Sequence, residues 1–438
     1  MIILIGFILF LFLNEVNLLE VLLTVAIIGA GIGGLSLGLC LHKLKIPFKI
    51  YEAVKELKPL GVGINIQPHA VRELYALGLK EQLDEIGLRT REVSYFSSQG
   101  GLIWSEPRGL RAGYRWPQYS IHRGMLQMLL YDELVRRAGN SCIETNCFLK
   151  FWEHDSDGVD MSFVDKVTNK TVLTERAKVI IACDGINSIV RNKMHPDEGV
   201  ANWAGIMMWR GVVKGPEFLK GNTMVMVGKK NCKFVAYPIK KFDDGDVLIN
   251  WICDLRYPED YTWLKQDWNR EGCLQDILPS FKEWSFDWVD IPTLLKSTKH
   301  IFEYPMVDRN PLSNWTSDRI TLLGDAAHAM YPIGSNGASQ AILDSVHLAK
   351  NIEKYGITQK ALISYEKVRR PIVNRIVEAN RLDGPDKILD IVAERAPKGF
   401  KNVQEIMKQD ELNLISESYK NLAGFDVDKL NQSEVIIG

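Results

Sequence analysis

The sequence predicts an α/β protein in which a parallel sheet with crossover helices alternates along the chain with a separate antiparallel sheet, followed by C-terminal helices. Two segments almost three hundred residues apart, near 24–41 and 319–340, each predict a strand, a glycine-containing loop and a helix. Between about 201 and 300 the sequence pattern changes to short β-like runs, and this segment contains seven tryptophans. Segments of the two types alternate along the chain, so the domains are predicted to be interleaved.

The composition fits a large globular protein. The chain has 438 residues, of which 46% are hydrophobic and 24% charged, enough for a sizeable core in two domains. The net charge of −1 gives no electrostatic case for nucleic-acid binding. Seven cysteines form no C-x-x-C pair, and eight histidines show no ligand spacing, so we expect reduced thiols in a cytoplasmic protein and no metal site.

The first thirteen residues are uncharged and apolar. They are too few to span a bilayer, and they lack the basic region and cleavage site of a signal peptide. Two interpretations stay open. Residues 1–13 are a short anchor on a membrane surface, or residues 1–22 belong to an over-extended reading frame, because the predicted fold starts near Leu23.

The first glycine-rich segment has the pattern of a dinucleotide site. Gly29, Gly31 and Gly34 form G-x-G-x-x-G between an apolar strand and an apolar helix, with Gly33 inside the motif. A second strand, 48–52, ends in Glu52, eighteen residues past Gly34, where a carboxylate suits ribose hydroxyls. The alternative is a glycine-rich turn with no ligand.

The second segment explains which dinucleotide is expected. The strand 320–323 runs into Gly324 and Asp325, and an aspartate at a strand end can accept hydrogen bonds from ribityl hydroxyls. A helix beginning near residue 338 turns its amides toward whatever lies beyond, which favours an anionic ring. A cofactor long enough to touch both segments is FAD rather than NAD. A third strand, 178–183, ends at the acidic turn Asp184–Gly185.

Three motifs in this order resemble those of the FAD-dependent aromatic-ring monooxygenases of the p-hydroxybenzoate hydroxylase fold. They are 29–34, 183–185 and 323–328, and the likeness covers about 23–370. Four further segments resemble the 5-methylphenazine-1-carboxylate 1-monooxygenase type of this family, which hydroxylates with decarboxylation: 61–68, 104–109, 117–124 and 330–340. The likeness indicates a subfamily and leaves the substrate open.

The resemblance implies a GR2-type, Rossmann-like FAD-binding domain and assigns roles to individual residues. In it the glycines 29, 31, 33 and 34 approach the FAD pyrophosphate and Glu52 binds the adenosine ribose, while Arg123 lies near the flavin. Asp184 and Gly185 serve FAD and NAD(P)H. Asp325 holds the ribityl chain, and Gly334, Asn336 and Gly337 approach the flavin ring. Pro332 would flank the ring, and no catalytic base is assigned. Arg191 either adds charge for NAD(P)H or forms an ordinary salt bridge, and His328 is expected to pack rather than act as a base.

The implied reaction uses NAD(P)H and O₂ to hydroxylate an aromatic or heteroaromatic substrate, with or without decarboxylation, through a C4a-hydroperoxyflavin. The alternatives are a flavin oxidoreductase that inserts no oxygen and a flavin-binding protein without catalysis. A flavin-dependent halogenase is disfavoured, because its W-x-W-x-I-P signature is only approximated at 284–292.

The predicted domains follow from the same patterns, and a monomer or homodimer is expected. An apolar extension occupies 1–22. The FAD-binding domain takes 23–93, 117–196 and 303–375, the substrate domain takes 94–116 and 197–302, and a C-terminal helical region takes 376–438.

Overall fold

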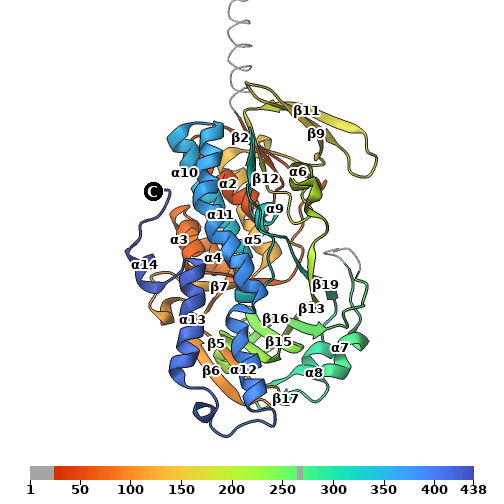
Figure 1. The fold of residues 1–438 in the computed structure, drawn as a ribbon, viewed down its shortest axis with the longest axis vertical. Helices are drawn as coiled ribbons and strands as arrows, with labels where there is room; N and C mark the ends of the chain where they lie inside the picture. The colour runs from red at the N-terminus through yellow and green to blue at the C-terminus, as the bar shows by residue number, and fades with distance from the viewer. Residues whose placement is uncertain (1–23, 264–269) are drawn as a thin grey trace, which may run out of the picture.

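The computed structural model describes residues 24–263 and 270–438. Figure 1 shows an elongated molecule with a parallel sheet toward one end and a large, mainly antiparallel sheet toward the other, joined along their length by the helix α11 (Gln359–Arg381). The predicted α/β architecture with C-terminal helices is confirmed. The predictions for residues 1–22, and for Trp268, fall outside the described residues.

The parallel sheet is the core of the first part. Its strand order is β20-β21-β12-β1-β2-β8, and all neighbours are parallel except the β20–β21 pair. Strands β1 and β12 are buried along their whole length, as expected for apolar runs covered on both faces. The strands are β1 (Val25–Ile28), β2 (Phe48–Tyr51), β8 (Ile143–Glu144), β12 (Val179–Ala182), β20 (Thr316–Ser317) and β21 (Ile320–Leu322).

Helices and a small sheet enclose this core. The glycine motif opens α2 (Ile32–Lys43), which packs with α10 (Gly337–Tyr355) and α5 (Arg123–Ala138). A three-stranded antiparallel sheet also packs on the core, where Phe163 stacks on Tyr51 with ring centroids 4.4 Å apart. Its strands are β9 (Phe148–His154), β10 (Val159–Val164) and β11 (Thr171–Ala177).

The second large sheet has seven strands in the order β19-β13-β16-β15-β14-β5-β6. The runs predicted near 223, 234 and 247 form three of them, with antiparallel pairing. One pair differs, since β14 and β5 run parallel to each other. Strand β5 belongs to a segment of the chain more than a hundred residues before β14. The strands are β5 (Glu92–Phe96), β6 (Leu102–Pro107), β13 (Asn202–Pro216), β14 (Thr223–Lys229), β15 (Cys232–Lys241), β16 (Asp246–Arg256) and β19 (Ile301–Asp308).

The tryptophans of this region mostly fill its core. Trp209 and Trp251 are fully buried in a cluster with Phe234 and Phe281. That cluster lies between the sheet and the short elements α7 (Leu274–Phe281), β17 (Ser285–Phe286), β18 (Val289–Asp290) and α8 (Ile291–Lys296).

A second three-stranded sheet lies between the two parts. Its order is β3-β7-β4, with antiparallel pairing. The predicted strand and helix around 119–137 are β7 and α5, and the helix expected from 69 to 77 is α3. The elements are β3 (Gly63–Ile66), α3 (Pro68–Ala76), α4 (Lys80–Ile86), β4 (Gly87–Thr90) and β7 (Gln118–His122).

The C-terminal helices cover the face of the large sheet near β5 and β14. Residues of α12 and α13 share a buried cluster with Val93, Tyr95 and Met226. The chain then returns to the first part, where the Ile436 amide donates to Glu73 and Lys43 donates to the Ile437 carbonyl. The helices are α12 (Lys387–Arg395), α13 (Gln409–Ala423) and α14 (Val427–Gln432). The exact domain boundaries stay a prediction.

Within the described residues, no helix combines the length and apolar character needed to span a membrane.

Candidate functional site

The predicted site residues follow the carboxyl ends of four neighbouring parallel strands. Glu52 follows β2, Gly29 follows β1, Asp184 comes two residues after β12, and Asp325 comes three residues after β21. The order β21-β12-β1-β2 places all four at one edge of the sheet, with Glu52 and Asp325 at its two ends. Three strand spacings of about 4.8 Å separate them, roughly 14 Å. One extended dinucleotide can therefore reach both.

The glycine motif has the geometry of a turn built for close approach. Gly29 has φ +105°, and a Cβ there would lie 2.6 Å from the Cys183 carbonyl oxygen. A Cβ on Gly34 would lie 2.0 Å from the Gly29 oxygen, and one on Gly33 would meet the Leu323 side chain. A Cβ on Gly31 would meet nothing within 4 Å. Gly29, Gly33 and Gly34 are thus needed because neighbouring segments of the chain itself approach them closely. Gly31, in contrast, borders open space at the start of α2, where a pyrophosphate would lie.

Glu52 is held in place by the glycine loop itself. Its carboxylate accepts hydrogen bonds from the Ala30 amide at 2.7 Å and the Val54 amide at 3.0 Å. Gln127 of α5 donates to the Ala30 carbonyl at 2.8 Å, which fixes the same turn from the other side. The carboxylate is only partly buried and can accept further donors such as ribose hydroxyls.

Arg123 and Asp325 both have solvent-exposed side chains. Arg123 opens α5, and Asp325 opens the short helix α9 (Asp325–His328). The protein around Arg123 lowers the pKa of its guanidinium, while the Asp325 carboxylate acts in the opposite direction. The two groups therefore share one electrostatic environment, although they belong to segments two hundred residues apart.

Asp184 is the most perturbed acid at this edge of the sheet. Its Oδ2 accepts from the Ile189 amide at 3.0 Å at the start of α6 (Ile189–Met194), while no partner for its Oδ1 lies in the described part of the chain. Burial raises the pKa of Asp184 from 3.8 to about 6. Gly185 beside it has φ +77°, and a Cβ there would meet nothing within 4 Å. The turn thus combines a buried carboxylate oxygen that lacks a hydrogen-bond partner among the described residues with open space beside Gly185.

The Asp184 shift predicts a pH-dependent effect of Asp184→Asn on the apoprotein. The folded state keeps a proton that the unfolded chain releases between pH 3.8 and 6, so ionisation destabilises the wild type fully only above pH 6. We expect the variant to be about 1–3 kcal/mol more stable at pH 7.5, with a smaller gain at pH 4.5. Urea unfolding at both values measures it. The exposed Asp157→Asn is the control, and a gain independent of pH would contradict the assignment.

The loop before α10 brings the remaining predicted residues together. Pro332 is exposed, Gly334 has φ +71°, and Asn336 is buried as the residue before the nineteen-residue helix α10, with its Oδ1 accepting from Gln340. A Cβ on Gly337 would meet only Met330, at 3.9 Å. The positive end of a long helix therefore faces the end of the sheet where Asp325 lies, which suits an anionic ring.

His328 has a packing role, in line with the prediction. Its Nε2 lies 2.5 Å from Asp344 Oδ2, and both side chains are buried. The same carboxylate accepts from the Gly324 amide at 3.1 Å and from Arg369 at 2.8 Å. Asp344 thus ties the Asp325 turn to α10 and α11 from behind.

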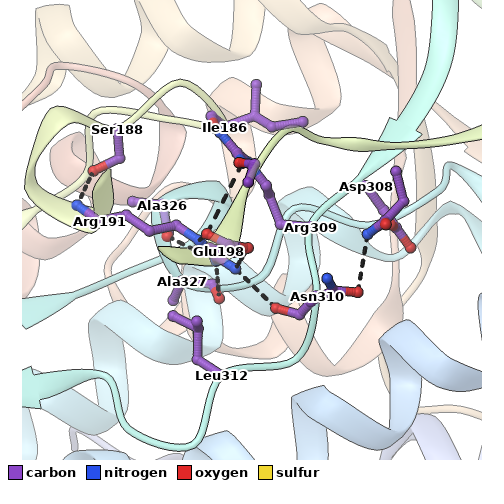
Figure 2. A network of polar contacts seen from close by, with 12 residues as sticks. Ile186, Ser188, Arg191, Glu198, Asp308, Arg309, Asn310, Leu312, Ala326 and Ala327 are labelled. Atoms are coloured by element: carbon purple, nitrogen blue, oxygen red, sulfur yellow. Dashed lines mark hydrogen bonds and ion pairs between the residues drawn. The ribbon is translucent and has the colours of Figure 1, made fainter. Parts of the chain in front are cut away.

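Arg191 forms the buried salt bridge that was one of its two open interpretations. Figure 2 shows its fully buried guanidinium paired with Glu198 and donating to backbone oxygens of Ala326, Ala327 and Asn310, at 3.1, 2.7 and 2.8 Å. The side chain therefore supports the α9 turn next to Asp325.

A cavity adjoins the Gly334 loop on the side of the large sheet, and the sequence analysis anticipated part of its lining but not the residues from the C-terminal helical region. The space available in it to the centre of a water-sized sphere is about 20 Å³, so a ligand larger than water requires the lining to move apart. The described lining comes from the large sheet, the region of the β3-β7-β4 sheet, the Gly334 loop and the C-terminal helical region, and no described tryptophan contributes. All four segments singled out for their likeness supply lining residues, namely Gln67, Arg108, Gln118, and Gly334 with Ser335. The lining residues are Gln67, Val93, Tyr95, Arg108, Gln118, Met224, Met226, Gly334, Ser335, Pro385, Ser416, Tyr419, Lys420 and Phe425.

In residues 24–263 and 270–438, no cluster of three or more His, Cys, Asp or Glu side chains is arranged to hold a metal ion. All seven cysteines lie in the described residues and are unpaired.

Comparisons with known proteins agree with this geometry. The family model described as "FAD binding domain" matches residues 23–380. The chain is 43% identical over 361 residues to phenazine 1,6-dicarboxylic acid hydroxylase PhzS of Lysobacter antibioticus, covering 82% of this chain and 89% of that protein. It is 26% identical to 6-hydroxynicotinate 3-monooxygenase of Pseudomonas fluorescens, covering 83% and 89%.

A solved salicylate hydroxylase in complex with its substrate shares the fold. The TM-score is 0.70 at 21% identity, covering 94% of this chain and 97% of that one. The relatives are FAD-dependent hydroxylases and monooxygenases of aromatic compounds, a family in which NAD(P)H is the typical co-substrate. The open space beside Gly31, the free oxygen of Asp184 and the helix end at Gly337 fit FAD. The chain belongs to the family of FAD-dependent aromatic-ring monooxygenases.

Proposed function

We propose that this protein hydroxylates a planar, polycyclic aromatic carboxylate of the phenazine type, using NAD(P)H and O₂, with or without loss of a carboxyl group. The observation that carries the proposal is the 43% identity to a phenazine dicarboxylate hydroxylase over 82% of the chain. The cavity beside Gly334 and Ser335 supports it, because apolar side chains such as Val93, Met224 and Phe425 line it together with two cationic groups.

Bound FAD would supply the activation of dioxygen, and the residues of the chain would bind and orient the FAD. In this proposal Gly31 admits the pyrophosphate and Glu52 accepts the ribose hydroxyls. Asp325 holds the ribityl chain beside Arg123, and the amides that open α10 stabilise negative charge on the ring. Asp184 and Gly185 offer a polar turn between these two ends of the cofactor, and Pro332 flanks the ring.

The substrate proposal predicts that phenazine-1-carboxylate accelerates NADPH oxidation by the yellow holoenzyme by about 10-fold or more. With ¹⁸O₂, one labelled oxygen should appear in the product, as mass spectrometry would detect. Quinoline and salicylate-type acids serve as smaller comparison substrates. Accelerated oxidation with no label in any product would favour an oxidoreductase that inserts no oxygen. No acceleration by any aromatic acid would favour a flavin-binding protein without catalysis.

We also keep as predictions a cytoplasmic location, a monomer or homodimer, and membrane contact restricted to residues 1–13.

A further inference from the structure

Three buried polar atoms at the cavity have no hydrogen-bond partner among the residues that the structure describes. They are the hydroxyl of Tyr95, Nε of Arg108 and Oε1 of Gln118. Tyr95 is fully buried and Gln118 is 2% exposed. Unpaired buried polar atoms are rare and costly in folded proteins, so three on one cavity indicate that a ligand pairs them.

Arg108 is held in place by a buried acid on the same strand end. Glu106 accepts from Arg108 at 2.6 Å, from Lys420 of α13 at 2.6 Å, and from the Ser416 hydroxyl. Burial raises the pKa of Glu106, but the charges of Arg108 and Lys420 outweigh it and keep that pKa below its usual range. Two cations therefore contact one carboxylate, and a second acid, Asp386, also acts on the neighbouring Tyr95.

The Glu106 contact leaves part of the Arg108 guanidinium available to the cavity. Arg108 uses one terminal nitrogen for Glu106, while its Nε is unpaired. Tyr95 lies beside it, close enough that Arg108 partly offsets the rise that burial causes in the pKa of this phenol. An N–H donor of Arg108 and the O–H donor of Tyr95 thus lie together at the cavity. This donor set matches an anion with two acceptor oxygens.

We propose that Arg108 and Tyr95 bind the carboxylate of the aromatic substrate, that Gln118 accepts a hydrogen bond from a donor on the same ring system, and that Glu106 is a positioning residue which orients Arg108 and Lys420. The inference rests on the proposed function, because it names the recognition group of that same cavity. The substrate class is a ring acid that also carries a hydroxyl or protonated nitrogen. The apolar lining from Val93, Met224 and Met226 receives the ring itself.

The test compares phenazine-1-carboxylate with phenazine-1-carboxamide, which has the same ring and no charge. In Arg108→Gln holoenzyme we expect KM for the carboxylate to rise about 10- to 100-fold, and KM for the carboxamide to change by less than about 3-fold. Tyr95→Phe keeps the aromatic ring and the ion pairs of Glu106, so this variant tests the proposal if Arg108→Gln fails to fold. In it we expect KM for the carboxylate to rise about 3- to 10-fold and KM for the carboxamide to stay unchanged. Arg111→Gln is the matched control, because Arg111 is exposed and pairs with Glu92 outside the cavity lining.

Perturbation of the flavin absorbance by each ligand measures binding without turnover and separates the two proposals. Turnover of both phenazines with equal losses in the Arg108 and Tyr95 variants would overturn the carboxylate assignment and leave the proposed function intact. Binding of the carboxylate that depends on Arg108, without turnover, would support the assignment and overturn the proposed function. Binding of neither ligand to the wild type would overturn both.

Discussion

The Gly31→Val variant should fold normally and purify without FAD. A side chain at this position points into space that is free of protein atoms within 4 Å, and Gly31 has an ordinary φ of −75°, so the apoprotein meets neither a clash nor strain. The same space is where the pyrophosphate approaches the first amides of α2, so a branched side chain excludes it. We expect FAD affinity to fall by about 100-fold or more. Absorbance at flavin wavelengths per protein, with thermal unfolding of the apoprotein, measures both effects.

Two glycine variants frame this result. Gly34→Val should destabilise the apoprotein by about 3 kcal/mol, because its Cβ would lie 2.0 Å from the Gly29 carbonyl oxygen. Gly215→Val in β13 meets only an ordinary contact at 3.7 Å and should retain both stability and FAD. A Gly31→Val protein with wild-type flavin content would show that the dinucleotide lies elsewhere.

The Arg191→Met variant should lose about 3 kcal/mol of stability, because the buried carboxylate of Glu198 keeps only the more distant Arg309, at 3.9 Å, as a counter-charge. Three backbone oxygens, those of Ala326, Ala327 and Asn310, also lose a donor. Denaturant unfolding of the apoprotein measures the loss. Since Ala326 and Ala327 follow Asp325 directly, FAD occupancy should fall as well.

The control for this variant is Arg176→Met. Arg176 pairs with Asp155 and Asp160, whose side chains are 56% and 63% exposed, so about 1 kcal/mol or less is expected. Arg191→Met would contradict the structural role if it left stability unchanged and raised KM for NADPH about 10-fold, since that outcome is the one a cofactor-binding arginine predicts.

The edge of the parallel sheet where the predicted cofactor residues lie could be predicted, because the sequence patterns that indicate it are local. Each strand is followed within three residues by the group that matters, so Gly29, Glu52, Asp184 and Asp325 could be found without knowing how the chain folds. Parallel strands bring such positions to one edge automatically. The family resemblance then indicated the cofactor, and the family match bears that out.

The cavity could not be predicted in the same way. Glu106 meets Ser416 across 310 positions of sequence, and nothing local to either residue indicates the contact. Lys420 lies on a helix with a charged outer face, where a lysine is normally solvated. The parallel pairing of β14 with β5 is equally non-local, because the paired residues Thr223 and Glu92 are 131 positions apart in the sequence. For Arg191 both interpretations fitted the motif, and only its burial selected one.

Glu106 takes its partners from two segments that lie far apart in the chain: Arg108 follows β6, whereas Ser416 and Lys420 belong to α13. One buried carboxylate therefore fastens the C-terminal helix to the edge of the large sheet. Without its charge, two neighbouring cations would repel each other across that junction, and the attachment of α13 would weaken.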